Sequence, residues 1–266
     1  MATTAISPAT NTMRPSVLGI CFKETKYEFL KCLRLPMYSV STIVFPVMFY
    51  VLFGLIMGHQ AIGGIGTTTY LIAAYGTFGV MGASLFGTAA TLASERGFGW
   101  LEVKKATPMP PFAYFLAKVV MSMIFSATDV VLLMILGTVF GGVHLPALVS
   151  AKLLLTLVAG SLPFCAMGLA IGYFAGPTSA PAFINVFYLP MSFCSGLWIP
   201  FMFLPQFIQK IAVLLPPFHL SQLALGLVGG GNGGSARSHW EALIGFAMIC
   251  LGIAWAGHQR DQRANG

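Results

Sequence analysis

Residues 95–105, Glu95-Arg96-Gly97-Phe98-Gly99-Trp100-Leu101-Glu102-Val103-Lys104-Lys105, lie between two long apolar segments of the chain. This short stretch holds five charged residues in a protein that has only 14 Lys and Arg and 7 Asp and Glu. Its aromatic and leucine side chains fall at helical spacing. The pattern predicts two membrane-spanning helices joined by a short amphipathic helix, which would offer a docking surface to a soluble partner.

Composition places the whole chain in a membrane. Of its 266 residues, 57% are hydrophobic and 8% are charged, and the mean hydropathy is +0.84, far outside the range of soluble globular domains. A helix needs about 20 apolar residues to cross a bilayer, because its backbone polar groups must be satisfied within the segment. The long uninterrupted apolar runs favour helices over barrel strands, so the predicted fold is an all-α membrane protein.

Lysine and arginine gather at the ends of the apolar runs, which accounts for the net charge of +7 without a nucleic acid partner. They concentrate before the first run, between the second and third, and after the last. Because positive residues stay on the cytoplasmic side, both termini are predicted to be cytoplasmic, in a multi-pass protein of the cytoplasmic membrane. Six transmembrane helices are expected, at residues 37–58, 70–93, 117–140, 153–176, 181–204 and 242–258.

Two segments flank the predicted transmembrane domain, which covers residues 17–258. Residues 1–16 read as a disordered tail, and residues 259–266 as a cytoplasmic tail. Within residues 17–34, apolar side chains fall on one helical face and charged ones on the other, as in a helix that lies in the membrane interface. The apolar set is Leu18, Phe22, Phe29 and Leu33, and the charged set is Lys23, Glu24, Glu28, Lys31 and Arg34.

Residues 205–229 are long and apolar enough to cross the membrane, but Lys210, the pair Pro216-Pro217 and His219 interrupt them. A seventh span would also place the basic C-terminus outside. The sequence therefore predicts a re-entrant helical hairpin between spans five and six, with helices at 206–215 and 220–228. The glycine-rich residues 229–234 would form an external loop.

Asp129 is the acidic residue that lies well inside a predicted span. An ionisable group in lipid is costly and points to function. It could serve as a titrating carboxylate in a proton relay or cation site, or be a structural acid bonded to Ser126, Thr128 or a neighbouring span. A proton-coupled secondary transporter centred on Asp129 is therefore one alternative function.

Four aromatic residues in spans two and five are candidates to line a path for a lipophilic substrate: Tyr75, Phe78, Tyr188 and Phe193. The alternative is that they pack the helices together. Small residues on one stripe of span two, Gly76, Ala83 and Gly87, favour close helix packing or a dimer contact.

Enzymatic motifs are missing from the sequence. It contains no GxxxxGK[ST] loop, so this chain is not expected to bind ATP in the usual way. An intramembrane serine protease would place glycine two residues before Ser195, where Phe193 stands. The histidines and cysteines lack metal-ligand spacing. We therefore expect neither enzymatic activity nor a cofactor or metal bound by this chain.

The sequence resembles the permease subunit of type-2 ABC exporters, including drug and antibiotic exporters. The resemblance covers nearly the whole chain, from 28–31 and 34–36 through Phe45-Pro46 to 195–200. Its most specific part is similar to the family's ERxxGTLE coupling-helix motif, with Trp100 in place of the usual threonine. The matching residues are Glu95, Arg96, Gly99, Trp100, Leu101 and Glu102, followed by Pro108.

The resemblance implies a permease whose coupling helix docks on a separate ABC ATPase, with ATP and Mg bound by that subunit. It further implies two permease copies, as a homodimer or heterodimer, around a path formed by spans one, two and five, and the re-entrant hairpin. Trp100 and Leu101 are the expected docking anchors. A non-transporting membrane scaffold or sensor remains a further alternative.

Overall fold

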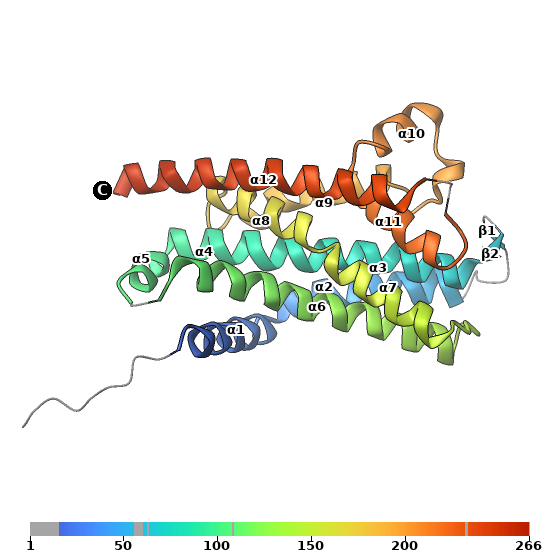
Figure 1. Cartoon of the computed structure of the whole chain (residues 1–266), viewed down its shortest axis with the longest axis horizontal. Helices are drawn as coiled ribbons and strands as arrows, with labels where there is room; N and C mark the ends of the chain where they lie inside the picture. The colour runs from blue at the N-terminus through green and yellow to red at the C-terminus, as the bar shows by residue number, and fades with distance from the viewer. Residues whose placement is uncertain (1–15, 56–60, 63, 108, 232–233, 266) are drawn as a thin grey trace, which may run out of the picture.

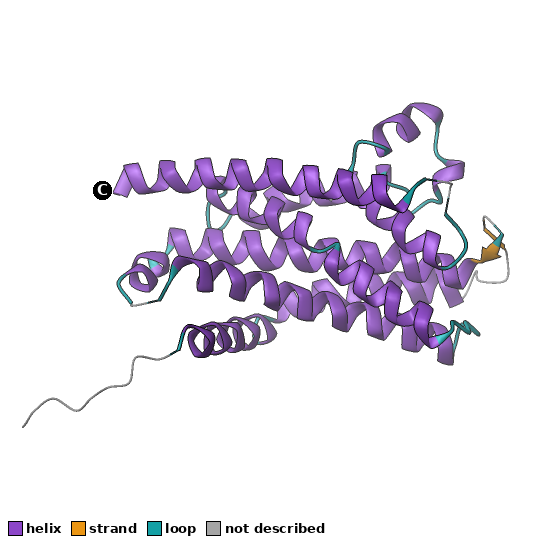
Figure 2. Cartoon of the chain, viewed as in Figure 1, coloured by secondary structure: helices purple, strands orange, loops and turns teal. Residues whose placement is uncertain are grey.

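The computed structural model describes residues 16–55, 61–62, 64–107, 109–231 and 234–265. They form a bundle of long helices that run roughly side by side, with one small antiparallel pairing of two short strands (Figure 1). Nearly all of the described chain is helical (Figure 2). In chain order the elements are α1 (Val17–Leu33), α2 (Pro36–Phe49), the π-helical η1 (Tyr50–Leu55), β1 (Ala61–Ile62), β2 (Ile65–Gly66), α3 (Thr67–Leu85), the π-helical η2 (Phe86–Ala90), α4 (Thr91–Gly97), α5 (Trp100–Lys105), α6 (Pro111–Val139), α7 (Ala147–Ala159), α8 (Leu162–Phe174), α9 (Ala180–Cys194), the 3₁₀ turn η3 (Phe201–Phe203), α10 (Gln206–Ala212), α11 (Pro216–Leu227) and α12 (Ala236–Asn265).

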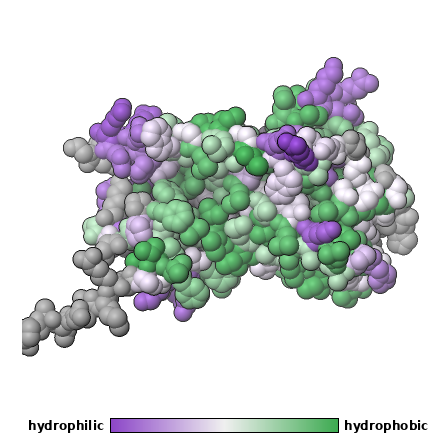
Figure 3. All heavy atoms as spheres, in the orientation of Figure 1, coloured by the Kyte–Doolittle hydropathy of each residue, from purple (hydrophilic) through white to green (hydrophobic). Residues whose placement is uncertain are grey.

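The all-α membrane fold is confirmed. Within the described ranges, four helical segments are long and apolar enough to cross a membrane, and two sharply bent helix pairs would bring the number to six. The four segments are Thr67–Gly97, Phe112–Val139, Ala147–Phe174 and Ala236–Arg263. Hydrophobic side chains cover the middle of the visible face, and hydrophilic ones gather toward both ends (Figure 3). This banding is what a bilayer requires of a multi-pass protein.

The amphipathic helix α1 begins after Ser16, whose hydroxyl accepts a hydrogen bond from the Gly19 amide at 3.1 Å. This is a standard N-cap. The predicted apolar stripe points mostly outward, since Leu18 and Phe22 are 83% and 73% exposed. Glu28 and Cys32 are instead buried against the bundle. The helix therefore presents apolar side chains outward, as an interfacial helix does, while part of its charged face turns inward.

The predicted fifth span, residues 181–204, is too long. Helix α9 ends at Cys194, after 15 residues. The chain then turns at Gly196, whose φ of +80° suits glycine, and a Cβ there would lie 3.2 Å from Phe201. The turn bends the following residues away from the helix axis and into η3, which ends the span.

The predicted fourth span, residues 153–176, lies within the candidate span Ala147–Phe174, which has a turn at residues 160–161 between α7 and α8. At this turn Gly160 lies against Leu220 of α11, and a Cβ on Gly160 would come within 2.2 Å of that side chain. The turn thus leaves room for α11. Helices α10 and α11 meet at an angle of 90°, in agreement with the predicted break near Pro216.

Helix α3 is buried along almost all of its length, and its small residues serve packing within the chain. Gly76 lies against Leu157 of α7 and Gly79 against Asp129 of α6, and Gly87 of the following η2 lies against Ser122 of α6. Glycine permits this close approach because any Cβ would meet those side chains. Helix α3 is therefore the central element around which α2, α6 and α8 are arranged (Figure 1).

Replacing Gly168 by Ala is expected to destabilise the fold by about 1–3 kcal/mol, the usual cost of overpacking. A Cβ at Gly168 of α8 would lie 1.9 Å from the Thr88 hydroxyl oxygen and 3.2 Å from the Leu85 carbonyl oxygen. The matched control is Gly245→Ala on α12, where the added methyl meets nothing within 4 Å. Both variants are compared by the midpoint of SDS-induced unfolding in mixed micelles. Equal midpoints would contradict the close packing of Gly168 against Thr88.

Candidate functional site

The segment that carries the coupling-helix motif forms a tight helix–turn–helix at one end of the bundle, near α1 and the C-terminus (Figure 1). Helix α4 ends at Gly97, and α5 starts after Gly99, whose φ is +76°. That left-handed conformation explains glycine at position 99. Gly97 is also required, because a Cβ there would come within 2.4 Å of the Pro177 ring. The turn is thereby fixed on the loop between α8 and α9.

Helix α5 has an inner and an outer apolar face. Leu101 is only 7% exposed and packs with Leu92, Leu169 and Tyr173. On the outside, Trp100 and Val103 of α5 are 61% and 57% exposed, and Phe98 of the preceding turn is 67% exposed. Leu101 therefore anchors α5 to its own chain, and among the two residues expected to dock a partner, only Trp100 is available for that role.

Glu95 lies at the centre of a buried ionic cluster. Its carboxylate accepts a hydrogen bond from the Tyr114 hydroxyl at 2.5 Å and lies 3.0 Å from the Lys118 ammonium. The Lys31 ammonium of α1 pairs with the other oxygen. Glu95 is 5% exposed and Lys118 is fully buried. The conspicuous acid of the motif thus faces inward and ties α4 to α1 and α6.

Lys104 extends the cluster from α5 to α1. Its ammonium lies 2.6 Å from the Glu24 carboxylate and 2.8 Å from the Glu28 carboxylate. Burial alone would lower the pKa of Lys104, but the Glu28 and Glu95 carboxylates more than offset that effect and raise this pKa. Lys104 thereby holds its positive charge firmly between two helices that are distant in sequence.

The cluster is balanced, with three carboxylates facing three ammonium groups. We define the ionic cluster as Glu24, Glu28, Lys31, Glu95, Lys104 and Lys118. Charges removed from water are stable only when each has a well-placed partner. Because the groups come from α1, α4, α5 and α6, the cluster joins these four helices into one unit.

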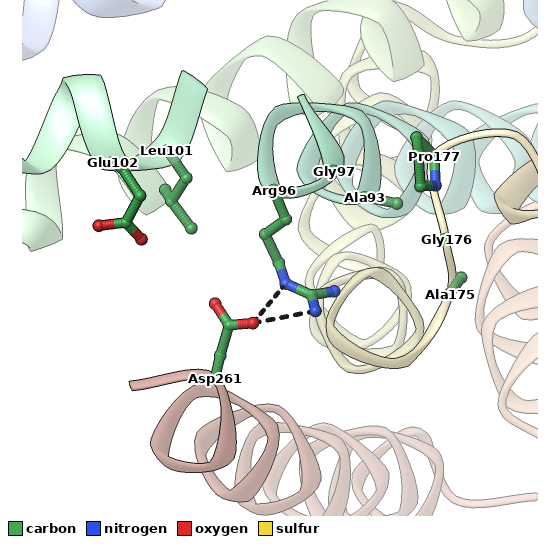
Figure 4. A pocket seen from close by; sticks show the side chains of 9 residues that line it. All are labelled: Ala93, Arg96, Gly97, Leu101, Glu102, Ala175, Gly176, Pro177 and Asp261. Carbon is green, nitrogen blue, oxygen red and sulfur yellow. Dashed lines mark hydrogen bonds and ion pairs between the residues drawn. The ribbon is translucent and has the colours of Figure 1, made fainter. Parts of the chain in front are cut away.

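Arg96 fixes the same turn to α12. Its guanidinium lies 3.0 Å from the Asp261 carboxylate, donates to the Gly172 carbonyl at 2.8 Å, and lies over the Tyr173 ring. Figure 4 shows this ion pair beside a cavity of about 230 Å³, with Glu102 of α5 on the rim. The motif's arginine is therefore also an internal contact, between α4, α8 and the end of α12.

The predicted path residues lie in one aromatic cluster. Phe78 stacks on Tyr188 with ring centroids 4.7 Å apart, and Tyr188 donates a hydrogen bond to the Phe78 carbonyl at 3.2 Å. Trp198 joins the others, at 5.3 Å from Phe78 and 4.9 Å from Phe193. These four rings thus connect α3 with α9 and the turn that follows α9.

Tyr75 enters the cluster through Phe49 of α2. The Phe49 ring centroid lies 6.3 Å from that of Tyr75 and 4.3 Å from that of Trp198. Tyr75 is 1% exposed, whereas Phe193 is 46% exposed. The aromatic cluster, Phe49, Tyr75, Phe78, Tyr188, Phe193 and Trp198, thus leads from the surface into the bundle.

Asp129 lies in the middle of α6 and is fully buried. Its side chain packs against Gly79 of α3, with Pro46 of α2 alongside. Among the residues that the structure describes, neither carboxyl oxygen has a hydrogen-bond partner. Neither Ser126 nor Thr128 donates a hydrogen bond to Asp129. The Ser126 hydroxyl has no partner among the described residues, and the Thr128 hydroxyl donates to the Ile124 carbonyl.

Several of these residues were not expected from the sequence. Glu28 and Lys118 carry buried charge, and Trp198 and Phe49 complete the aromatic cluster. The position of Lys118 just inside an apolar span could have predicted its ion pairs, because a buried charge requires a partner.

Comparison with known proteins identifies the family of the chain. The ABC-2 type transporter family matches residues 21–227, which include α2 to α11 and most of α1. The chain is also 24% identical to a Bacillus subtilis (strain 168) protein described as "Putative transport permease YvfS", over 81% of this chain and 88% of that protein. The chain therefore belongs to the ABC-2 type transporter family, as a multi-pass permease subunit of an ABC transporter, a family that implies an ATPase partner.

Proposed function

We propose that this permease moves an amphiphilic or lipophilic substrate, such as a drug, an antibiotic or a lipid, outward across the cytoplasmic membrane. ATP and Mg bind a separate ATPase subunit that docks on α5. One observation carries the docking: α5 and the turn before it expose Phe98, Trp100 and Val103, while the inner side of α5 is fixed by Leu101 and Lys104. An exposed apolar face on a firmly held element is what a docking partner requires.

The buried contacts support a lever mechanism. The ionic cluster holds α5 to α1 and α6, and Arg96 holds the same turn to α8 and α12. A displacement of α5 by the ATPase would therefore move several spans together. For ATP to drive transport, each nucleotide state must favour a different arrangement of these spans. Two permease copies, each with its ATPase, would enclose the substrate between them.

Membrane orientation gives a direct prediction. Lys and Arg near α1, α5 and the C-terminus favour a cytoplasmic location for that end, with α10 and α11 outside. In a variant without its native cysteines, Gln262→Cys should react with an impermeant maleimide only after permeabilisation. Ser235→Cys, before α12, should react in intact cells. Reaction of both positions from the same side would refute this orientation.

The assembly itself is the test of the proposal. The full-length chain, produced with the ATPase from its own genetic neighbourhood, is expected to purify as a complex of two permeases and two ATPases that hydrolyses ATP. Native mass spectrometry gives the stoichiometry, and an ATPase variant without its catalytic glutamate is the control for activity. A permease that purifies without any ATPase, and that transports with a proton gradient alone, would refute the proposal.

A further inference from the structure

Asp129 is a carboxylic acid without a counter-charge in the interior of the bundle. It is fully buried, and both of its oxygens lack a hydrogen-bond partner among the described residues. An ionised carboxylate in these surroundings is costly. Its charge must therefore be balanced by a proton or by a cation that binds beside it.

Two further unpartnered hydroxyl groups lie on the helices that pack at Asp129, α6 and α2. The Ser126 hydroxyl lies one turn earlier on α6, and the Thr42 hydroxyl lies one turn before Pro46 on α2; both are buried without a partner in the described part of the chain. Pro46 also has no N–H to donate to the Thr42 carbonyl. These groups offer acceptor oxygens and no positive charge, so their chemistry favours a cation.

Aromatic rings lead from the surface to the same place. Phe193 is 46% exposed and stacks on Trp198, which contacts Phe78, which stacks on Tyr188. The Tyr188 hydroxyl lies against Gly82. Aromatic faces attract cations as well as apolar groups, so this series of rings suits an aromatic or lipophilic cation.

The rings and the carboxyl group share one helix turn. Gly82 adjoins the Tyr188 hydroxyl, and Gly79, one turn earlier on α3, adjoins the Asp129 carboxyl group. Because neither glycine has a side chain, Tyr188 and Asp129 lie against the same stretch of backbone. The inner end of the aromatic series, the Tyr188 hydroxyl, therefore lies one helix turn of α3 away from the Asp129 carboxyl group.

We propose that Asp129 and the aromatic cluster form a binding site for lipophilic organic cations, which makes such cations a substrate class of this permease. The proposal rests on the proposed export function and names its cargo. In this structure Asp129 packs directly on Gly79 of α3. A cation would therefore bind in a conformation in which α2 and α3 have moved apart. When a cation enters, the carboxyl proton leaves to solvent, and the charge of the site stays balanced.

The test compares tetraphenylphosphonium with triphenylphosphine oxide, a neutral molecule that carries three of the same phenyl groups. The full-length chain in nanodiscs is assayed by scintillation proximity with tritiated tetraphenylphosphonium, with empty nanodiscs as the background. Unlabelled tetraphenylphosphonium should compete, and triphenylphosphine oxide should not. Asp129→Asn should weaken binding by about 30-fold or more, as loss of one member of a buried charge pair does. Glu241→Gln, which removes an exposed carboxylate of α12, should bind like the wild type.

A pH titration provides a measurement that does not depend on the variant's folding. Since a proton and the cation compete for one carboxylate, the affinity of the wild type should rise with pH. Among the described groups that face Asp129, Tyr188 of α9 carries an uncharged phenol, and Pro46 and Gly79 carry no charge. Competition by triphenylphosphine oxide as strong as that by tetraphenylphosphonium, unchanged binding in Asp129→Asn, or a flat pH profile in the wild type would each overturn the proposal. Because the assay contains no ATPase, such a failure leaves the export function to its own test.

Discussion

Replacing Lys118 by Met is expected to destabilise the protein by about 3–5 kcal/mol, the largest stability effect that the structure predicts. Lys118 is fully buried, and its ammonium contacts both Glu95 at 3.0 Å and Glu28 at 3.4 Å. Methionine has a similar length but no charge, so the variant leaves the ionic cluster with three carboxylates and two ammonium groups. An uncompensated buried carboxylate causes the loss.

The double variant Lys118→Met with Glu95→Gln separates charge imbalance from lost packing. It restores equal numbers of positive and negative groups, so its destabilisation should be smaller than the sum of the two single effects. Lys210→Met on the exposed side of α10 is the matched control. The midpoint of SDS-induced unfolding is measured for the wild type, the two single variants, the double variant and the control. Additive losses, or a Lys118→Met midpoint equal to that of the control, would contradict the account of the cluster.

Replacing Phe98 and Trp100 together by Ala is expected to weaken the association with the ATPase by about 2 kcal/mol or more, roughly 30-fold in Kd. Exposed aromatic side chains are the usual anchors of such an interface. Both side chains are more than half exposed, Trp100 on the outer side of α5 and Phe98 in the turn before it. Stability should hardly change, because neither residue belongs to the core of the chain. Kd is measured by biolayer interferometry between the permease in nanodiscs and the purified ATPase.

Two controls make this result specific. Trp255→Ala removes a tryptophan of similar exposure, 64% against 61% for Trp100, from the outer side of α12, and its Kd should match the wild type. Leu101→Ala removes an internal contact. It should reduce the free energy of unfolding by about 2–5 kcal/mol, the cost of truncating a core leucine, and so lower the unfolding midpoint. A Phe98/Trp100 variant that binds the ATPase as tightly as the wild type would exclude α5 as the docking surface.

The fold could be predicted largely from the sequence because lipid imposes a strong pattern. Apolar runs located the central helices, and the pair Pro216-Pro217 located the break between α10 and α11. The ends of spans were less predictable. At Gly160 the following Pro163 was a local signal, because proline has no N–H to continue the helix. The contact of Gly160 with Leu220 and the turn of Gly196 against Phe201 depend on residues outside the helix and had no such signal.

The candidate site was predictable only in part, since local spacing identifies a motif but not its partners. Residues 95–102 stood out as a charged island, yet the inward direction of Glu95, Arg96 and Leu101 depends on distant residues. Lys31 lies 64 positions before Glu95, and Asp261 lies 165 positions after Arg96. For the same reason Trp198, which connects the aromatic residues of α3 and α9, had no local signature.

The central claim, that the ATPase moves the spans through α5, is tested most directly by a distance between the two α5 helices of the assembled transporter. Val103 is exposed on the outer side of α5, and a spin label at Val103→Cys, in a chain whose native cysteines are replaced, reports on both copies by double electron–electron resonance. We expect the distance distribution to shift when ATP and vanadate are added, and to stay unchanged with an ATPase variant that cannot bind ATP. Identical distributions with and without nucleotide, in a complex that hydrolyses ATP, would contradict the account.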